Sequence, residues 1–267
     1  MLSSIFLKTL RDQRRSMVWW SLGAGILVGV MVGFYPTIEG IEGFQELVDQ
    51  YPDSLMAMFG ASDLANIATP AGYLNAELFG FMVPMLMAVF AVGRGSGAVA
   101  GEERAGTMEL LLSQPVSRNR LVLEKYAAMT VSILELSTFI WIVLVVGARV
   151  VGMDIGAVRL AEMCLSLALL GLAFGGVAFA VGAVTGRHGL SVAVGASVVA
   201  GGWVLNTLSL LSQVMEPAKW LSLMHYYNGD TPLVNGLNPA HAGVMLVVVL
   251  VCLGVAHVGF QRRDLRV

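Results

Sequence analysis

The chain is poor in charged residues and in cysteine. Only 13% of its 267 residues are charged, whereas 57% are hydrophobic; a soluble domain carries about 25% charged residues. The two cysteines, Cys164 and Cys252, both lie in apolar runs, so the sequence predicts neither a disulfide framework nor a metal site. A net charge of −2 offers no basic surface to nucleic acid. These absences indicate a membrane protein that has no nucleic-acid partner.

Sequence motifs for catalysis are also absent. No Gly-x-x-x-x-Gly-Lys-Ser/Thr loop occurs, so the chain lacks the phosphate-binding motif of an ATPase. The histidines show no paired metal-binding spacing, and no Gly-x-Ser-x-Gly elbow is present. We therefore predict that the chain is not an enzyme and that it holds no catalytic residue, cofactor or metal of its own.

Long apolar runs predict an all-α polytopic membrane protein that forms one transmembrane domain over residues 1–267. A span needs about 20 mostly apolar residues. The six expected spans are Ser16–Ile38, Leu74–Ala100, Tyr126–Ala148, Met163–Gly186, His188–Met215 and His241–Gln261. Residues 1–15 put Leu2, Ile5 and Phe6 on one helical face and basic residues elsewhere, which predicts an N-terminal interfacial helix.

Basic residues predict the orientation of the spans. If both termini are cytoplasmic, 13 of the 16 Lys and Arg residues lie on the inner side of the membrane. Residues 39–77 carry seven acidic residues and no basic one, so we expect them to form an extracellular loop. The sequence thus predicts a multi-pass protein of the cytoplasmic (inner) membrane, surrounded by lipid, with both termini inside.

A second polar stretch, from Trp220 to Leu237, separates the last two expected spans. It mixes Trp220, Tyr226 and Tyr227 with Pro232 and Asn235. Such a mixture is typical of an interfacial aromatic belt or of a partial re-entry into the membrane.

The segment between the second and third expected spans is short, charged and amphipathic. Its polar face carries Glu102, Glu103, Arg104 and Glu109, its apolar face is Leu110–Leu112, and Pro115 ends any helix near Gln114. Such a helix on the water side of a membrane suits docking into a groove of a soluble partner. It could equally be an interfacial helix that only shapes a loop. The residues alone leave both interpretations open, and nothing in the sequence requires an internal partner for the polar face.

The same segment resembles a family signature. Residues 101–118 follow the pattern G-E-E-x-x-G-T-x-E-x-L-L-S-x-P-V-S-R, which is similar to the permease subunits of type-2 ATP-binding-cassette (ABC) exporters. Tyr35-Pro36 after the first span and Arg263-Asp264 near the end fit the same family. The resemblance implies that residues 101–115 are a cytoplasmic coupling helix. Its ATPase-contacting residues would be Glu102, Glu103, Arg104, Gly106, Thr107, Glu109 and Leu111.

The resemblance also implies partners. A separate cytoplasmic ABC ATPase subunit would carry ATP and Mg, and a second permease subunit, identical or similar, would complete the pathway. In the family the second and fifth spans flank the interface where substrate passes, which points to Phe79, Met82, Met85 and Asn206. Met and Phe side chains can adapt to varied apolar ligands, but they also form ordinary helix-packing or lipid-facing surface.

Glu135 is a carboxylate deep in the third expected span, and we count it with the pathway residues. It lies ten residues past Lys125, about 15 Å along a helix, where a charge is costly and usually functional or paired. A hydrogen bond to Ser137, Thr138 or Asn206 would make it structural. As a proton site it would favour the alternative function, an ion- or proton-coupled secondary transporter without an ATPase. The lack of an internal repeat argues against that alternative.

Overall fold

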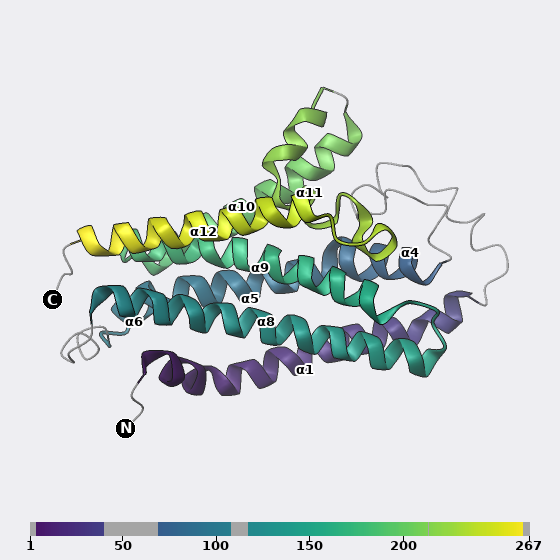
Figure 1. The fold of residues 1–267 in the computed structure, drawn as a ribbon, viewed down its shortest axis with the longest axis horizontal. Coiled ribbons are helices and arrows are strands. Elements are labelled where there is room, and N and C mark those ends of the chain that lie inside the picture. The colour runs from purple at the N-terminus through teal and green to yellow at the C-terminus, as the bar shows by residue number, and fades with distance from the viewer. Residues whose placement is uncertain (1–3, 40–68, 108–116, 213, 264–267) are drawn as a thin grey trace.

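A computed structural model of the chain describes residues 4–39, 69–107, 117–212 and 214–263, and these described residues form helices and turns with no strand (Figure 1). Six of the helices are long and apolar enough to cross a membrane, as the sequence predicts. They lie side by side in a bundle. Both ends of the chain and the short helix α6 lie at the same end of that bundle.

The described helices follow in this order along the chain. The first span is α1 (Ile5–Glu39), and the second is a continuous helical run of α4 (Pro70–Leu74), η2 (Asn75–Met82), α5 (Val83–Ser96), η3 (Gly97–Gly101) and α6 (Glu102–Arg104). The remaining spans are α8 (Arg118–Val151), α9 (Ala157–Thr185), α10 (His188–Leu211) and α12 (Pro239–Arg262). Between the last two lie η4 (Glu216–Leu221), α11 (Leu223–Asn228) and η5 (Thr231–Asn235).

The N-terminal region differs from the prediction. A separate interfacial helix over residues 1–15 is not confirmed, because α1 runs unbroken from Ile5 into the first span. Residues 5–15 contain no glycine or proline that would break a helix. The side chains of Ile5 and Thr9 are buried, so these first turns pack against the bundle.

The second span begins earlier in the chain than expected. It begins at Pro70, so residues 70–77 are helical and do not belong to the loop predicted for residues 39–77. Thr69 caps this start, since its hydroxyl accepts a hydrogen bond from the Gly72 N–H at 3.1 Å. Pro84 lies inside the run and has no N–H to donate, and the π-helical turns of η2 directly precede it.

Helix α9 is the centre of the bundle. Buried residues make up 78% of its apolar stretch, and it packs against α5, α8, α10 and α12. At its crossing with α5 the backbones touch: a Cβ on Gly95 would lie only 2.1 Å from the carbonyl oxygen of Gly175. Small residues are what permit such an approach between membrane helices.

Helix α10 is the least covered span. Only 17% of its apolar stretch is buried, and its C-terminal part projects with η4 from the side of the bundle (Figure 1). Leu208, Leu210 and Leu211 are exposed there. In the protein by itself, this apolar surface has only lipid or another chain to contact.

Candidate functional site

The charged segment begins inside the second span. Glu102, Glu103 and Arg104 form its last helical turn as α6, rather than the start of a separate helix over residues 101–115. Gly106, at φ +69°, then ends the helix in a left-handed conformation that suits glycine. Residues 108–116, with Glu109 and Leu111, lie outside the described residues, so the rest of the predicted coupling helix stays a prediction.

Glu102 forms a buried ion pair. Its Oε1 lies 2.5 Å from Nζ of Lys125 on α8, and the Lys125 side chain is only 5% exposed. The other carboxylate oxygen accepts a hydrogen bond from the Thr107 hydroxyl. A buried ammonium group needs such a partner, because leaving it unpaired away from water is strongly unfavourable. The pair therefore joins the end of the second span to the start of the third.

Glu103 joins the same turn to the C-terminal end of the last span. Its carboxylate pairs with the guanidinium of Arg263, which also donates to the carbonyl oxygen of Ala183 at 3.1 Å. Arg118 Nη1 in turn donates to the Arg263 carbonyl at 2.9 Å. Gly186, at φ +67°, leaves the space for this contact, since a Cβ there would lie 2.4 Å from Glu103 Oε2.

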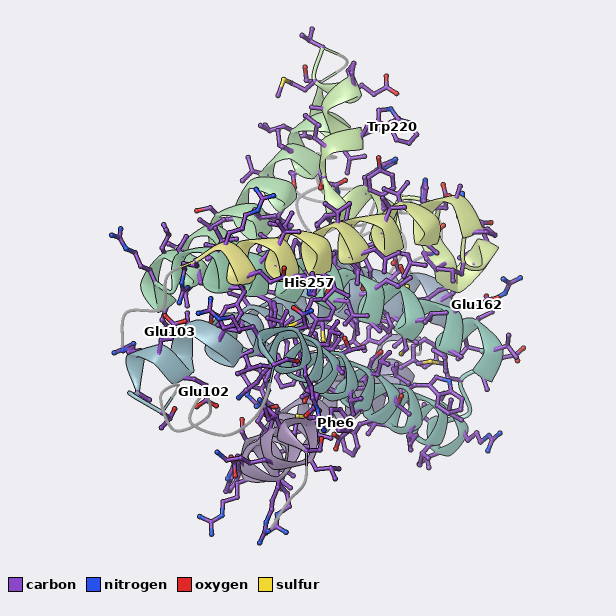
Figure 2. The ribbon with its side chains drawn as sticks, turned by 60° about the vertical axis from the view of Figure 1, so that its left-hand side comes forward. Phe6, Glu102, Glu103, Glu162, Trp220 and His257 are labelled. Carbon is purple, nitrogen blue, oxygen red and sulfur yellow. The ribbon has the colours of Figure 1, made fainter. Side chains whose placement is uncertain are left out.

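The two ion pairs change the interpretation of the polar face. Glu102 and Glu103 have internal partners, which the sequence did not require, and Figure 2 shows both carboxylates at the end of the bundle where α6 ends. Arg104, in contrast, is exposed. Of the three charged residues in this turn, Arg104 is therefore the one whose side chain is exposed at this end of the bundle.

A third polar contact ties the N-terminus into the same end. Glu124 on α8 accepts hydrogen bonds from the Phe6 N–H at 2.8 Å and from the Ser4 hydroxyl at 3.0 Å. These bonds satisfy the start of α1, whose first N–H groups have no partner within the helix. The opening turns of α1 are thus held against α8, close to the Glu102–Lys125 pair along the same helix.

The predicted pathway residues fall into different environments. Phe79 is fully buried inside the bundle, and its carbonyl accepts a hydrogen bond from the Tyr227 hydroxyl at 3.1 Å. Met82 and Met85 are partly buried, and Met85 packs against the core. Asn206 lines a cavity together with residues of α11. Their role in a pathway therefore stays a prediction.

Glu135 has an unexpected neighbour of opposite charge. It lies on an exposed face of α8, and its carboxylate interacts electrostatically with Arg94 on α5. Ser137, an expected partner, instead donates to the Cys164 carbonyl at 2.6 Å. Arg94 also donates to the Ser16 hydroxyl on α1 at 3.2 Å. The opposite charges of Arg94 and Glu135 therefore stand in the same region of the membrane-spanning bundle.

Sequence reasoning missed the basic partners of Glu102 and Glu103. Lys125 and Arg263 counted only towards the orientation and the family pattern, although both lie at span ends. The sequence does contain a signal for these pairs: two adjacent acidic residues end the second span, and single basic residues lie at the ends of other spans. Among the described residues, no group of three or more His, Cys, Asp or Glu side chains is placed to hold a metal ion.

Comparison with models of protein families gives a match over nearly the whole chain. Residues 3–265 match the model of a family described as ABC-2 family transporter protein. A search of curated proteins found no match. The family match covers the six helices of the described residues that are able to cross a membrane, as well as the charged turn of α6.

Proposed function

The chain belongs to the ABC-2 family of transporter proteins, and from this premise we propose that it is the permease subunit of an ABC exporter of the inner membrane, with both termini in the cytoplasm. A separate ATPase subunit with bound ATP and Mg drives it. A second permease subunit completes the pathway.

The observation that carries the proposal is the pair of ionic contacts at the charged turn. Residues 108–116 connect α6 to α8, and Glu102 and Glu103 tie α6 to Lys125 and Arg263. An ATPase that pushes on this connection moves α6, and the ion pairs pass the movement to α8 and α12. Helix α8 has 34 residues and is about 51 Å long, so it carries such a movement across the membrane as a rigid rod.

Helix α10 supports the second subunit. It has the least buried apolar stretch of the six spans found in the described residues, and its C-terminal part projects from the bundle. A second copy of the chain, packed on this face, would bury the exposed leucines there. In the exporter family the fifth span flanks the interface where substrate passes, so the placement agrees with the assignment.

The neighbourhood of Glu135 weakens the secondary-transporter alternative. A lone carboxylate in a span suggests a proton site, but Arg94 supplies an opposite charge. The depths agree: Arg94 precedes Glu102 by eight residues and Glu135 follows Lys125 by ten, about 12 and 15 Å along their helices. The nearby positive charge of Arg94 therefore favours a charged carboxylate at Glu135 over a lone proton site.

The test of the proposal reverses one exposed charge. Arg104→Glu and Arg262→Glu change matched exposed arginines, of which only Arg104 adjoins the 108–116 connection. Charge reversal at Glu103 is less informative, because it breaks an internal ion pair. An ABC ATPase, chosen by its P-loop motif from the reading frames adjacent to the gene, is co-purified with each variant. We expect Arg104→Glu to weaken its retention about tenfold, or ~1.4 kcal/mol, and Arg262→Glu to retain it. Equal retention by both, or no retention by the wild type, would overturn the assignment of this docking site.

A further inference from the structure

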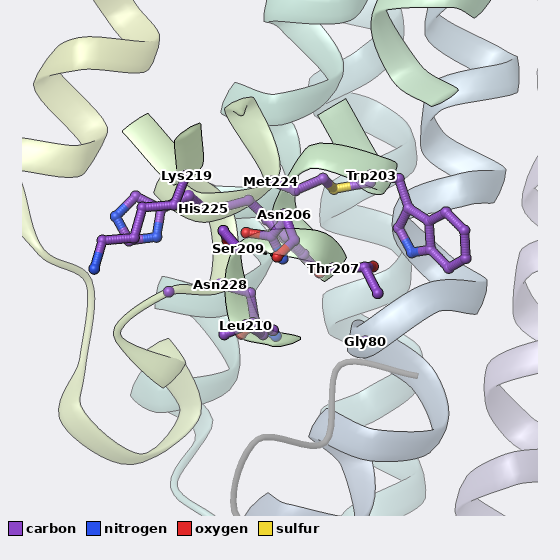
Figure 3. A pocket seen from close by; sticks show the side chains of 12 residues that line it. Gly80, Trp203, Asn206, Thr207, Ser209, Leu210, Lys219, Met224, His225 and Asn228 are labelled. Atoms are coloured by element: carbon purple, nitrogen blue, oxygen red, sulfur yellow. Dashed lines mark hydrogen bonds between the residues drawn. The ribbon is translucent and has the colours of Figure 1, made fainter. Parts of the chain in front are cut away.

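A polar cavity of about 190 Å³ lies where α10 ends (Figure 3). It is enclosed by the C-terminal part of α10, by α11 and by Gly80 of η2. The residues that matter for its chemistry are Trp203, Asn206, Met224, His225, Asn228 and Lys219. At the ion pairs of Glu102 and Glu103 the polar atoms bond to each other, whereas the polar residues at this site line a cavity.

Two buried polar atoms of this cavity lack partners. His225 Nε2 and Asn228 Oδ1 are two of only three buried side-chain nitrogen or oxygen atoms in the described residues that have no hydrogen-bond partner. A buried polar atom left unpaired is unfavourable by about 1–3 kcal/mol and calls for an explanation. Both atoms belong to side chains that line the same cavity. Because the terminal torsions of His and Asn are soft, a small rotation turns each atom towards an occupant.

The cavity is electrically neutral. None of its lining residues is acidic, and its one formal cation, Lys219, pairs with Glu216 at 2.9 Å. Burial lowers the pKa of His225, and His241 and Lys219 lower it further, against an opposing effect of Asp230. The imidazole of His225 is therefore neutral at pH 7. A charged occupant would have no counter-ion in this space.

A hydroxyl group matches both unpaired atoms. Asn228 Oδ1 accepts a hydrogen bond, while His225 Nε2 donates or accepts according to its tautomer, and a hydroxyl does both. Met224 and, on the opposite side of the cavity, the Trp203 ring supply apolar surface. The volume corresponds to about six water molecules at ~30 Å³ each. It is below the ~300 Å³ of a whole drug-sized site, so the cavity accommodates one moiety.

From these observations we propose that the cavity binds a neutral, hydroxyl-bearing group such as a sugar or polyol moiety, held by Asn228 Oδ1 and His225 Nε2 on the side of the cavity that faces the Trp203 ring. Nothing in this binding requires an ATPase or a direction of transport.

The experiment uses three probes of the same size. The full chain in lipid nanodiscs is titrated with methyl β-D-glucoside, with glucosamine as the cationic analogue and with glucuronate as the anionic one, and binding is followed by saturation-transfer NMR. We expect saturable binding of the glucoside and at least about tenfold weaker binding of both charged analogues. Asn228→Leu, which removes the unpaired acceptor at similar volume, weakens glucoside binding about tenfold.

Stability separates binding from a structural role. Asn228→Leu keeps or raises the melting temperature, because it removes a buried unpaired polar atom. Asn119→Leu changes an exposed asparagine at the other end of the bundle and leaves glucoside binding unchanged. If no probe binds saturably, the cavity holds only water and the proposal fails. Tighter binding of either charged analogue, or a large loss of melting temperature in Asn228→Leu, also overturns it. Since the assay contains no ATPase, its failure leaves the exporter assignment untouched, and loss of ATPase docking leaves this site untouched.

Discussion

Two polar regions of the helix bundle, the ion pairs of α6 and the cavity lined by α10 and α11, differ in whether their polar atoms have partners. At the end of the bundle where α6 lies, Glu102 and Glu103 each pair with a basic residue, and these pairs together with the Arg263–Ala183 hydrogen bond connect four spans. Around the cavity at the other end, His225 Nε2 and Asn228 Oδ1 are buried without partners. Fully paired groups stabilise one arrangement of helices, whereas unpaired groups raise the energy of the empty state and favour an occupant. The first region is therefore suited to transmit movement, and the second to bind.

The Glu102–Lys125 ion pair is also less exposed than the Lys219–Glu216 pair beside the cavity. The Lys125 side chain is 5% exposed, whereas Glu216 of the Lys219–Glu216 pair is 59% exposed. Exposed ion pairs contribute about 0–1 kcal/mol to the free energy of unfolding. Removing one partner of a buried pair has a larger effect, because the remaining charge is left away from water without a partner. The comparison predicts a ranking of mutational effects.

The largest effect is expected at Glu102. Glu102→Ala leaves the Lys125 ammonium buried and unpaired, so it should lower the free energy of unfolding by about 3 kcal/mol. Adding Lys125→Met removes the stranded charge and should restore most of that loss. The matched control, Glu216→Gln, should shift stability by less than about 1 kcal/mol. Thermal unfolding in detergent measures all three, and equal shifts for Glu102→Ala and Glu216→Gln would remove the distinction between the two regions.

A smaller effect is expected at the turn between α9 and α10. Gly186→Ala places a Cβ at φ +67° and within 2.4 Å of Glu103 Oε2, so it should destabilise the fold by about 1–2 kcal/mol. Gly189→Ala, three residues on, meets nothing within 4 Å and should be neutral or slightly stabilising. The melting temperatures of the two variants test this. A neutral Gly186→Ala would show that the Glu103–Arg263 contact tolerates displacement.

The smallest effect concerns pH and the cavity end. Burial lowers the pKa of His225 in the folded chain, with contributions from His241 and Lys219. The His225 side chain then binds a proton more readily in the unfolded chain than in the folded one. The contribution of the neutral imidazole to the free energy of unfolding is therefore fully present above about pH 6.5 and is lost as pH falls below it. Melting temperatures measured from neutral to mildly acidic pH should fall less steeply in His225→Phe than in the wild type. His257→Phe, on α12, is the control variant and should keep the wild-type slope. A slope that is less steep in His257→Phe than in His225→Phe would contradict the prediction.

Much of the fold could be predicted because membrane insertion is a local property. Each span needs only a sufficient run of apolar residues, and this requirement identified the six helices, although α1 and α8 begin 11 and 8 residues before their predicted starts. Helix ends were less predictable where packing decides. Residues 5–15 looked interfacial by their charge pattern, yet the burial of Ile5 and the Glu124 contacts hold them as part of α1.

The sequence by itself determined the class of the protein, the six spans and the charged turn whose pattern carries the family resemblance. Only the tertiary structure decided what that turn contacts, because Glu103 and Arg263 are 160 residues apart along the chain and opposite charges have many candidate partners in sequence. The same holds for the cavity. His225 and Asn228 are ordinary loop residues by sequence, and whether their polar atoms find partners depends on how α11 packs against α10.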